Sequence, residues 1–165
     1  MTLIDFAQDD TRFQVRVAAV FLHDGHVLLQ GSRDHDHWIL PGGRGEMLEP
    51  TGESVRREMR EEFGVEVEVG RLLWFVENFF THEGIRTHQL GLIFETHLPA
   101  DCDLLNTIRD FAGYDDGVPF IARWFPLTAL PNTWLLPSFL CEALQSLPET
   151  PQHIVHTDER RLGRI

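Results

Sequence analysis

The segment GRGEMLEPTGESVRREMREEFGV, residues 43–65, decides the fold of this chain. Its second half predicts a helix of about three turns that begins after a candidate N-cap, Thr51, and stops at Gly64, a residue suited to the left-handed position that closes a helix. At about 100° per residue, three apolar side chains form one stripe of this helix: Val55, Met59 and Phe63. Three acidic side chains share the neighbouring stripe, between core and solvent: Glu58, Glu61 and Glu62.

These three glutamates repel one another on a helix. Like charges three or four residues apart cost a few tenths of a kcal/mol per pair on an exposed helix, and more in a cleft of lower dielectric. A bound dication would relieve the repulsion, and oxygen ligands suit Mg2+ or Mn2+, with Mg2+ completing its shell from water and substrate phosphates. The pattern therefore predicts a metal site for a phosphate ester or anhydride. The alternative is a solvated helix in which Arg57 and its neighbours neutralise the acids.

The loop Pro41-Gly42-Gly43 precedes the helix, and loop and helix together resemble the motif of the Nudix family. That motif reads Gly, five residues, Glu, seven residues, Arg-Glu, an aliphatic residue, any residue, Glu-Glu, any residue, Gly, aliphatic. Every fixed position is matched: Gly43, Glu49, Arg57, Glu58, Met59, Glu61, Glu62, Gly64 and Val65. One departure is Leu48, which stands where most members of the family carry glycine.

The resemblance implies an α/β (α+β) Nudix fold, with a mixed β-sheet sandwiched between helices. It implies a metal-dependent pyrophosphohydrolase that cleaves a nucleoside diphosphate linked to another moiety, with Mg2+ or Mn2+ as cofactor. The metal ligands that it implies are three carboxylates and one backbone carbonyl: Glu58, Glu61, Glu62 and Gly42. Arg57 is expected to fix the motif glutamates and Glu49 by charge-assisted hydrogen bonds.

Two points of the chemistry stay open. Glu61 is the first choice for the general base, and the open alternatives are four loop aspartates: Asp101, Asp103, Asp115 and Asp116. Glu95, within a strand, is a further candidate ligand. As a second function we consider a Nudix-fold nucleotide-binding sensor without turnover, although such modules are expected to lose motif acids. An isomerase of the same fold would need a catalytic cysteine, and neither Cys102 nor Cys141 has a context that indicates one.

Substrate binding is expected to involve arginine, because a guanidinium matches phosphate oxygens in a bidentate way. The candidate binding residues are Arg16, Arg33, Arg44 and Gly43. Three aromatic residues are candidates for stacking on a base or for the core: Trp38, Phe79 and Phe80. A polar cluster is interpreted as a hairpin loop, with metal contact as its alternative: Asp34, His35, Asp36 and His37.

Composition limits the class of protein. A chain of 165 residues is the size of one domain. The formal net charge of −12 argues against partners that present phosphate backbones or anionic lipid, so we expect a small-molecule substrate, no nucleic acid and no membrane. The sequence has no signal-like start and no apolar run near the roughly 20 residues that span a bilayer, which predicts a cytoplasmic location. A homodimer is possible, since dimers are frequent in the family.

The strand pattern predicts a mixed sheet. Strands are expected at residues 12–22, 27–29, 38–40, 65–69, 72–80, 87–98 and 120–125, with the second paired back on the first. A long loop is expected at residues 99–119 and a second helix at 137–147. Residues 1–148 are interpreted as a single Nudix hydrolase domain and residues 149–165 as a C-terminal tail, in which Ile154 and Val155 could form a brief strand.

Overall fold

Strand β2 (Thr11–Val20) is buried on both faces along its second half, and it lies in the middle of the molecule. Successive side chains of a strand point to opposite faces. Val17 and Ala19 accordingly join one apolar cluster, whereas Ala18 and Val20 join the other. The structure is a computed structural model that describes residues 2–32, 37–115 and 117–158.

The first sheet has the strand order β1, β2, β8, β7, β12, and β6 also pairs with β2. Its other strands are β1 (Asp5–Gln8), β6 (Gly42–Arg44), β7 (Glu68–His82), β8 (Ile85–His97) and β12 (Gln152–Thr157). The sheet is mixed, because β2 runs parallel to β8 and β12 runs parallel to β7, while the remaining pairs are antiparallel. The turn between β7 and β8 lies at Glu83 and Gly84, which both have positive φ.

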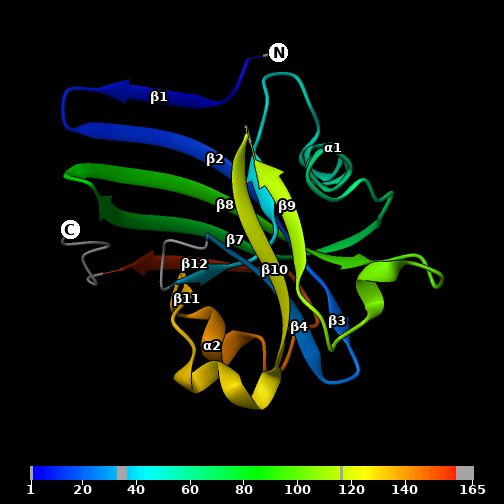
Figure 1. Ribbon diagram of the computed structural model, residues 1–165. Helices are drawn as coiled ribbons and strands as arrows, with labels where there is room; N and C mark the ends of the chain where they lie inside the picture. The colour runs from blue at the N-terminus through cyan, green and yellow to red at the C-terminus, as the bar shows by residue number, and fades with distance from the viewer. Residues whose placement is uncertain (1, 33–36, 116, 159–165) are drawn as a thin grey trace.

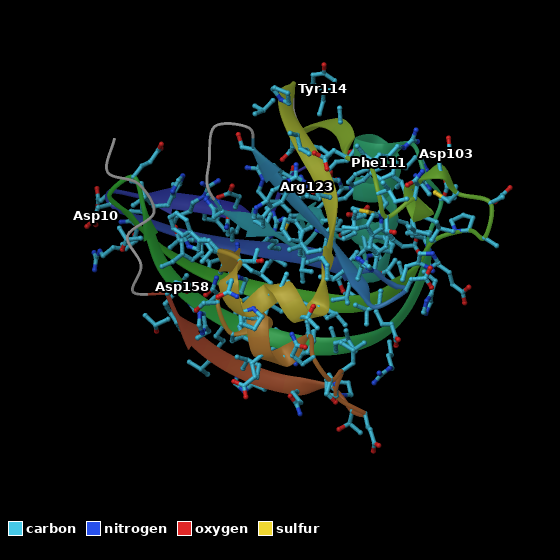
Figure 2. All side chains as sticks on the ribbon, turned by 60° about the horizontal axis from the view of Figure 1, so that its bottom comes forward. Asp10, Asp103, Phe111, Tyr114, Arg123 and Asp158 are labelled. Carbon is cyan, nitrogen blue, oxygen red and sulfur yellow. The ribbon has the colours of Figure 1, made fainter. Side chains whose placement is uncertain are left out.

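The second sheet has the order β11, β5, β4, β10, β9, and β3 pairs with β4. Its strands are β3 (Leu22–His23), β4 (His26–Ser32), β5 (Trp38–Ile39), β9 (Phe111–Asp115), β10 (Val118–Pro126) and β11 (Leu135–Leu136). Side chains fill the space between the sheets, while Tyr114, near the end of β9, points outward into solvent (Figure 2).

Two helices complete the fold, α1 (Thr51–Phe63) and α2 (Leu140–Ala143), with two 3-10 turns, η1 (Asp103–Leu105) and η2 (Leu127–Asn132). Figure 1 shows α1 near the top of the view and α2 near the bottom, with the strands of both sheets between them. The apolar stripe of α1 packs on the cluster that contains Val17, and α2 packs on the cluster that contains Val20. The predicted α+β fold with mixed sheet between helices is therefore confirmed, although the strands form two sheets. Among the described residues, no helix is long and apolar enough to cross a bilayer.

The predicted pairing of residues 27–29 with the first strand is wrong. Only a short hairpin forms, in which Leu22 lies opposite Val27 and His23 lies opposite His26. Both edges of β2 are already occupied, by β8 on one side and by β1 and β6 on the other. Strand β4 therefore crosses into the second sheet and pairs with β10 along its whole length.

Three other boundaries differ from the prediction. Helix α1 has Pro50 rather than Thr51 as its N-cap, without a side-chain cap, whereas Gly64 closes it in the left-handed conformation as expected. The loop at 99–119 contains η1 and the edge strand β9, whose side chains are mostly exposed and so carry no alternating apolar pattern. Strand β7 begins at Glu68, so residues 65–67 precede it.

The two C-terminal elements also differ in length from the prediction. Regular helix at 137–147 is confined to α2, although Leu140 and Leu144 are both buried as the helical spacing predicts. The expected tail contains β12, in which Ile154 lies opposite Val76 of β7 and packs against the core, so the alternative of a strand applies there.

Leu48 has a left-handed backbone with φ of +67°, and its side chain is fully exposed. A residue with a Cβ is destabilised by roughly 1–2 kcal/mol in the left-handed region, and glycine avoids this strain. Glycine also loses more conformational entropy on folding, which cancels part of the gain. Leu48→Gly should therefore raise the free energy of unfolding by up to about 1 kcal/mol in urea titrations. Met47→Gly, at the neighbouring position without positive φ, should lower it, and a loss of stability in both variants would contradict this explanation.

Asp5 of β1 binds Arg12 of β2, with 2.7 Å between Asp5 Oδ1 and Arg12 Nε, and Arg44 of β6, at 3.0 Å. The hydrogen bond from Arg12, supported by Arg44, lowers the pKa of Asp5 to about 2. A lowered carboxylate pKa stabilises the fold fully above the ordinary pKa near 4, and this stabilisation is lost as the pH falls toward 2. Asp5→Asn should therefore cost more stability at pH 6 than at pH 3 in thermal unfolding, and an equal cost at both values would refute this role.

Candidate active site

Arg57 is the centre of the polar network between α1 and the loop before it. Its Nε lies 3.1 Å from Glu49 Oε1, its Nη2 lies 3.1 Å from Glu49 Oε2, and its Nη1 donates to Glu58 Oε1 at 2.7 Å. Nη2 also donates to the backbone carbonyl of Arg44, 3.1 Å away, which ties the helix to strand β6. One guanidinium therefore fixes two motif acids and the strand beside them, as the family resemblance predicts.

The pKa values of this network follow from its hydrogen bonds. Burial by itself lowers the pKa of Arg57, but the hydrogen bonds to Glu49 and Glu58 outweigh it and raise that pKa above its ordinary value. Burial opposes ionisation of Glu49, yet the hydrogen bonds from Arg57 and from Ser54 Oγ, at 2.7 Å, keep the pKa of Glu49 below its ordinary value. Glu49 is therefore a charged anchor that holds Arg57 in place.

Glu58 and Glu62 are buried carboxylates, exposed by only 8% and 7%. Burial raises the pKa of Glu58 even though Arg57 binds it, and burial raises the pKa of Glu62 to about 8. Glu62 Oε1 has one weak partner, Gln30 Nε2 of β4 at 3.4 Å, and Glu62 Oε2 is buried without a partner among the described residues. Glu58 is thus neutralised by Arg57 at a cost in desolvation, whereas Glu62 is incompletely satisfied by the described protein groups.

Glu61 differs from the other two acids because its side chain is 62% exposed, and its Oε2 lies 3.5 Å from Arg57 Nη1. Glu58, Glu61 and Glu62 do share one flank of α1, as the helical count predicts, but they point into different surroundings. No group of three or more acidic, histidine or cysteine side chains within the described ranges converges as a complete metal-ligand set. A dication held here would need further ligands, which Mg2+ ordinarily takes from water and substrate phosphates.

The donor chemistry nevertheless fits a hard cation. All of the candidate ligands are oxygens, and the unpartnered Glu62 Oε2 is a buried acceptor that a positive ion would satisfy. The carbonyl of Gly42, the fourth candidate ligand, accepts a hydrogen bond from Arg16 Nη2 at 3.0 Å and keeps a second lone pair. A Cβ at Gly43 would overlap the carboxylate of Glu58, so a side chain there would force that carboxylate to move.

A cavity of about 520 Å³ lies over one face of β2, β8 and β7, and we call it the sheet cavity. Among its lining side chains are two predicted substrate-binding residues, Arg16 and Arg44. Burial lowers the pKa of Arg16, while the nearby charges of Glu62 and Glu58 oppose that shift, so this guanidinium connects the cavity to the motif acids. The third predicted arginine, Arg33, lies outside the described residues.

The three aromatic candidates for base stacking lie in different surroundings. Phe80 lines the sheet cavity. Phe79 instead stacks on His88 with ring centroids 4.5 Å apart, and Trp38 packs edge-on against Phe125 at 4.7 Å in the second sheet. Of the polar hairpin loop, only His37 is described, and it lines the sheet cavity, whereas Asp34, His35 and Asp36 lie outside the described residues.

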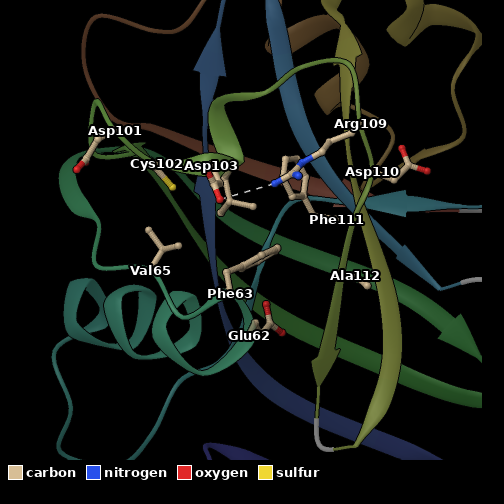
Figure 3. A pocket seen from close by; sticks show the side chains of 11 residues that line it. Glu62, Phe63, Val65, Asp101, Cys102, Asp103, Arg109, Asp110, Phe111 and Ala112 are labelled. Atoms are coloured by element: carbon tan, nitrogen blue, oxygen red, sulfur yellow. Dashed lines mark ion pairs between the residues drawn. The ribbon is translucent and has the colours of Figure 1, made fainter.

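The acids considered as alternative general bases, and Glu95 as a further metal ligand, lie in different parts of the structure. Asp115 lines the sheet cavity, Asp116 lies outside the described residues, and Glu95 binds Arg71 at 2.8 Å. Asp101 and Asp103 line a separate pocket of about 700 Å³ beyond the C-terminal end of α1. Figure 3 shows Asp103 directed at Arg109, with Glu62 at the other end of this pocket.

Sequence reasoning missed several residues of the site. Ser54 supports Glu49, Gln30 contacts Glu62, and Glu46 is buried 3.6 Å from Arg57. Ser54 lies in the Gly-Glu-Ser sequence just after the loop, which was a usable signal. No sequence signal indicated Gln30, because only the packing of α1 on the strands brings Glu62 close to it.

Part of the chain is similar in sequence to known phosphohydrolases. Over 55 residues, or 33% of this chain and 31% of that protein, the chain is 46% identical to diphosphoinositol polyphosphate phosphohydrolase 2 of Rattus norvegicus. The chain thus spans about a third of the length of the curated relatives it matches.

Solved structures share the fold. A MutT protein from Bacillus halodurans superposes with a TM-score of 0.60 at 16% identity, over 87% of this chain and 89% of that one. An ADP-ribose pyrophosphatase from Streptococcus suis gives a TM-score of 0.50 at 19% identity, over 86% and 98%. The model of the NUDIX domain matches residues 12–140, well over half of the sequence, so this protein belongs to the Nudix family.

Proposed function

We propose that this protein is a metal-dependent pyrophosphohydrolase that cleaves the diphosphate linkage of a nucleoside diphosphate joined to another moiety. A nucleoside triphosphate, a nucleotide sugar and an ADP-ribose-like compound are substrates of this kind. The single observation that carries the proposal is the pair of buried carboxylates Glu58 and Glu62, the second with an unpartnered oxygen, beside an arginine-lined cavity. The similarity to phosphohydrolases and pyrophosphatases points to the same class of reaction. The single domain expected at residues 1–148 is proposed to act as one catalytic unit together with β12, which completes the first sheet.

In this proposal Glu58, Glu61, Glu62 and the Gly42 carbonyl hold Mg2+ or Mn2+, which when bound supplies positive charge to the phosphoryl oxygens. Arg57 does not touch the substrate and acts as a positioning residue, because it fixes Glu58 and, through Glu49, the loop. Arg16 and Arg44 bind phosphate oxygens from the cavity side.

Glu61 is proposed as the general base. Its carboxylate is exposed and therefore reachable by water, unlike those of Glu58 and Glu62. It takes one proton from the attacking water, whose oxygen forms the new bond to phosphorus while the bridging P–O bond breaks. The electron pair of that bond leaves with the second phosphate group.

The proposed function is tested by incubating the full chain with Mg2+ and a panel of nucleoside diphosphate derivatives, and identifying the phosphorylated products. Two phosphorylated products from one substrate are expected. Binding of nucleotides with no turnover across the panel would instead indicate a sensor, the second function considered from the sequence. The presence of every motif acid favours turnover.

Glu62→Gln keeps the shape of this buried side chain but cannot ionise to bind a cation, so turnover should fall by orders of magnitude while the fold stays intact. Steady-state kinetics and thermal unfolding measure the two effects. Glu66→Gln is the matched control, because Glu66 lies just beyond the same helix, is exposed and pairs only with Arg60 in the described structure. Near-wild-type rates in Glu62→Gln would remove Glu62 from the ligand set.

Arg57→Lys keeps the positive charge but loses the fork that binds Glu49, Glu58 and the Arg44 carbonyl together. Loss of such support around metal ligands typically costs 10–100-fold in metal affinity or activity. The Mg2+ concentration for half-maximal rate should therefore rise at least tenfold in a magnesium titration. Arg56→Lys, at the partly exposed neighbour that pairs with Glu53, should leave this concentration unchanged, and equal effects of both substitutions would argue against the positioning role.

A further inference from the structure

The sheet cavity has an ordered polar floor that follows from strand register. Gln14 of β2 lies opposite Gln89 of β8, and Gln89 lies opposite Asn78 of β7. Residues opposite one another in a sheet share a face, and all three of these side chains line the sheet cavity. The side chains of Gln14, Gln89 and Asn78 therefore form a row of carboxamides across three strands, which we call the amide row.

The amide row lies beside a row that carries positive charge. Arg16 lies opposite Arg44 on one side and opposite Gly91 on the other, two residues along β2 from Gln14. Two residues of strand correspond to about 7 Å. A phosphate group held by Arg16 and Arg44 would thus place the next part of a substrate over the carboxamides.

Two of the three carboxamides are buried, and one of these two is incompletely satisfied. Asn78 is 5% exposed and Gln89 is 8% exposed, yet Asn78 Oδ1 has no hydrogen-bond donor among the described residues. His82 Nδ1, on the same face of β7, is also buried and unpartnered within the described part of the chain. A buried carboxamide oxygen without a donor is unfavourable, and a ligand that donates to it would remove this deficit.

The charge of the cavity limits what the ligand can be. The chain contains no lysine, and its fourteen basic residues are all arginines. Three of them line the cavity, but Arg12 and Arg44 share Asp5, and two aspartates, Asp115 and Asp158, line the same space. A ring that carries several phosphates, as a diphosphoinositol polyphosphate does, would bring negative charges that this cavity cannot balance.

An uncharged heterocycle fits these groups better. Carboxamides offer both a donor and an acceptor, and they pair with the edge of a nucleobase through two hydrogen bonds. Phe80, two residues from Asn78 on the same face of β7, offers a ring on which a base can stack. We propose that the amide row determines specificity for the substrate and selects a nucleobase over a phosphorylated polyol. This inference rests on the proposed function.

Binding to the full chain tests the inference without requiring turnover. Calorimetry with Mg2+ compares AMP, GMP, CMP and UMP with inositol hexakisphosphate and inorganic pyrophosphate. At least one nucleoside monophosphate should bind, and its Kd should rise at least tenfold in Asn78→Leu and several-fold in Gln14→Leu. Inositol hexakisphosphate should bind no more tightly than pyrophosphate. Glu77→Gln, the adjacent residue on the other face of β7, should leave every Kd within twofold.

Each outcome decides one point. Failure of all four nucleotides to bind, an unchanged Kd in the folded variants, or tighter binding of inositol hexakisphosphate would overturn the inference. If Asn78→Leu does not fold, Gln14→Leu carries the test, because Gln14 is only partly buried. The expected binding pattern without hydrolysis of any diphosphate derivative would support the amide row and overturn the proposed hydrolase activity alone.

Discussion

The site depends on the burial of carboxylates against a sheet, where Arg57 binds Glu58 directly and Arg16 acts on Glu58 and Glu62 through its charge. Arg57 binds Glu49 and Glu58 and so connects helix α1, the loop before it and strand β6. Glu62, in contrast, accepts only a weak hydrogen bond from Gln30 among the described residues. The position of the Glu58 carboxylate depends on Gly43, since any side chain there would displace it. Burial therefore disfavours the charged forms of Glu58 and Glu62, and a dication is the natural complement that would keep both carboxylates ionised.

The alternation of two strands divides the chemistry between two faces of the first sheet. In β2, Val17 faces the core beneath α1, whereas Arg16 faces the sheet cavity. In β6, Gly43 faces Glu58 while Arg44 faces the cavity, because Arg44 lies opposite Arg16. Neighbouring residues thus serve the motif acids and the phosphate-binding arginines, and the two groups of side chains meet where these strands meet.

Local patterns in the sequence were sufficient for α1 and for its glutamate flank, because a helix places residues three and four apart on one face whatever surrounds it. The role of Arg57 was expected from the family resemblance. Non-local choices were not predictable. Strand β4 left the first sheet because both edges of β2 were taken, and Gln30 met Glu62 only as a result. The amide row joins residues 14, 78 and 89, whose alignment is set by strand register and not by any spacing along the chain.

The remaining question is how a chain with a net charge of −12 attracts an anion at all. At long range its field repels a polyphosphate, and the repulsion grows with the charge of the ligand. Screening shortens that field to roughly 10 Å at ordinary salt, so attraction is decided by the charges within the site. Arg16, Arg44 and a bound dication can offset one diphosphate there, whereas Asp115 and Asp158 penalise further charge on the same ligand. The positive charges of the site can therefore offset the diphosphate but not a second charged group. The rest of the substrate is expected to be neutral, and the carboxamides of the amide row can form hydrogen bonds with such a neutral group.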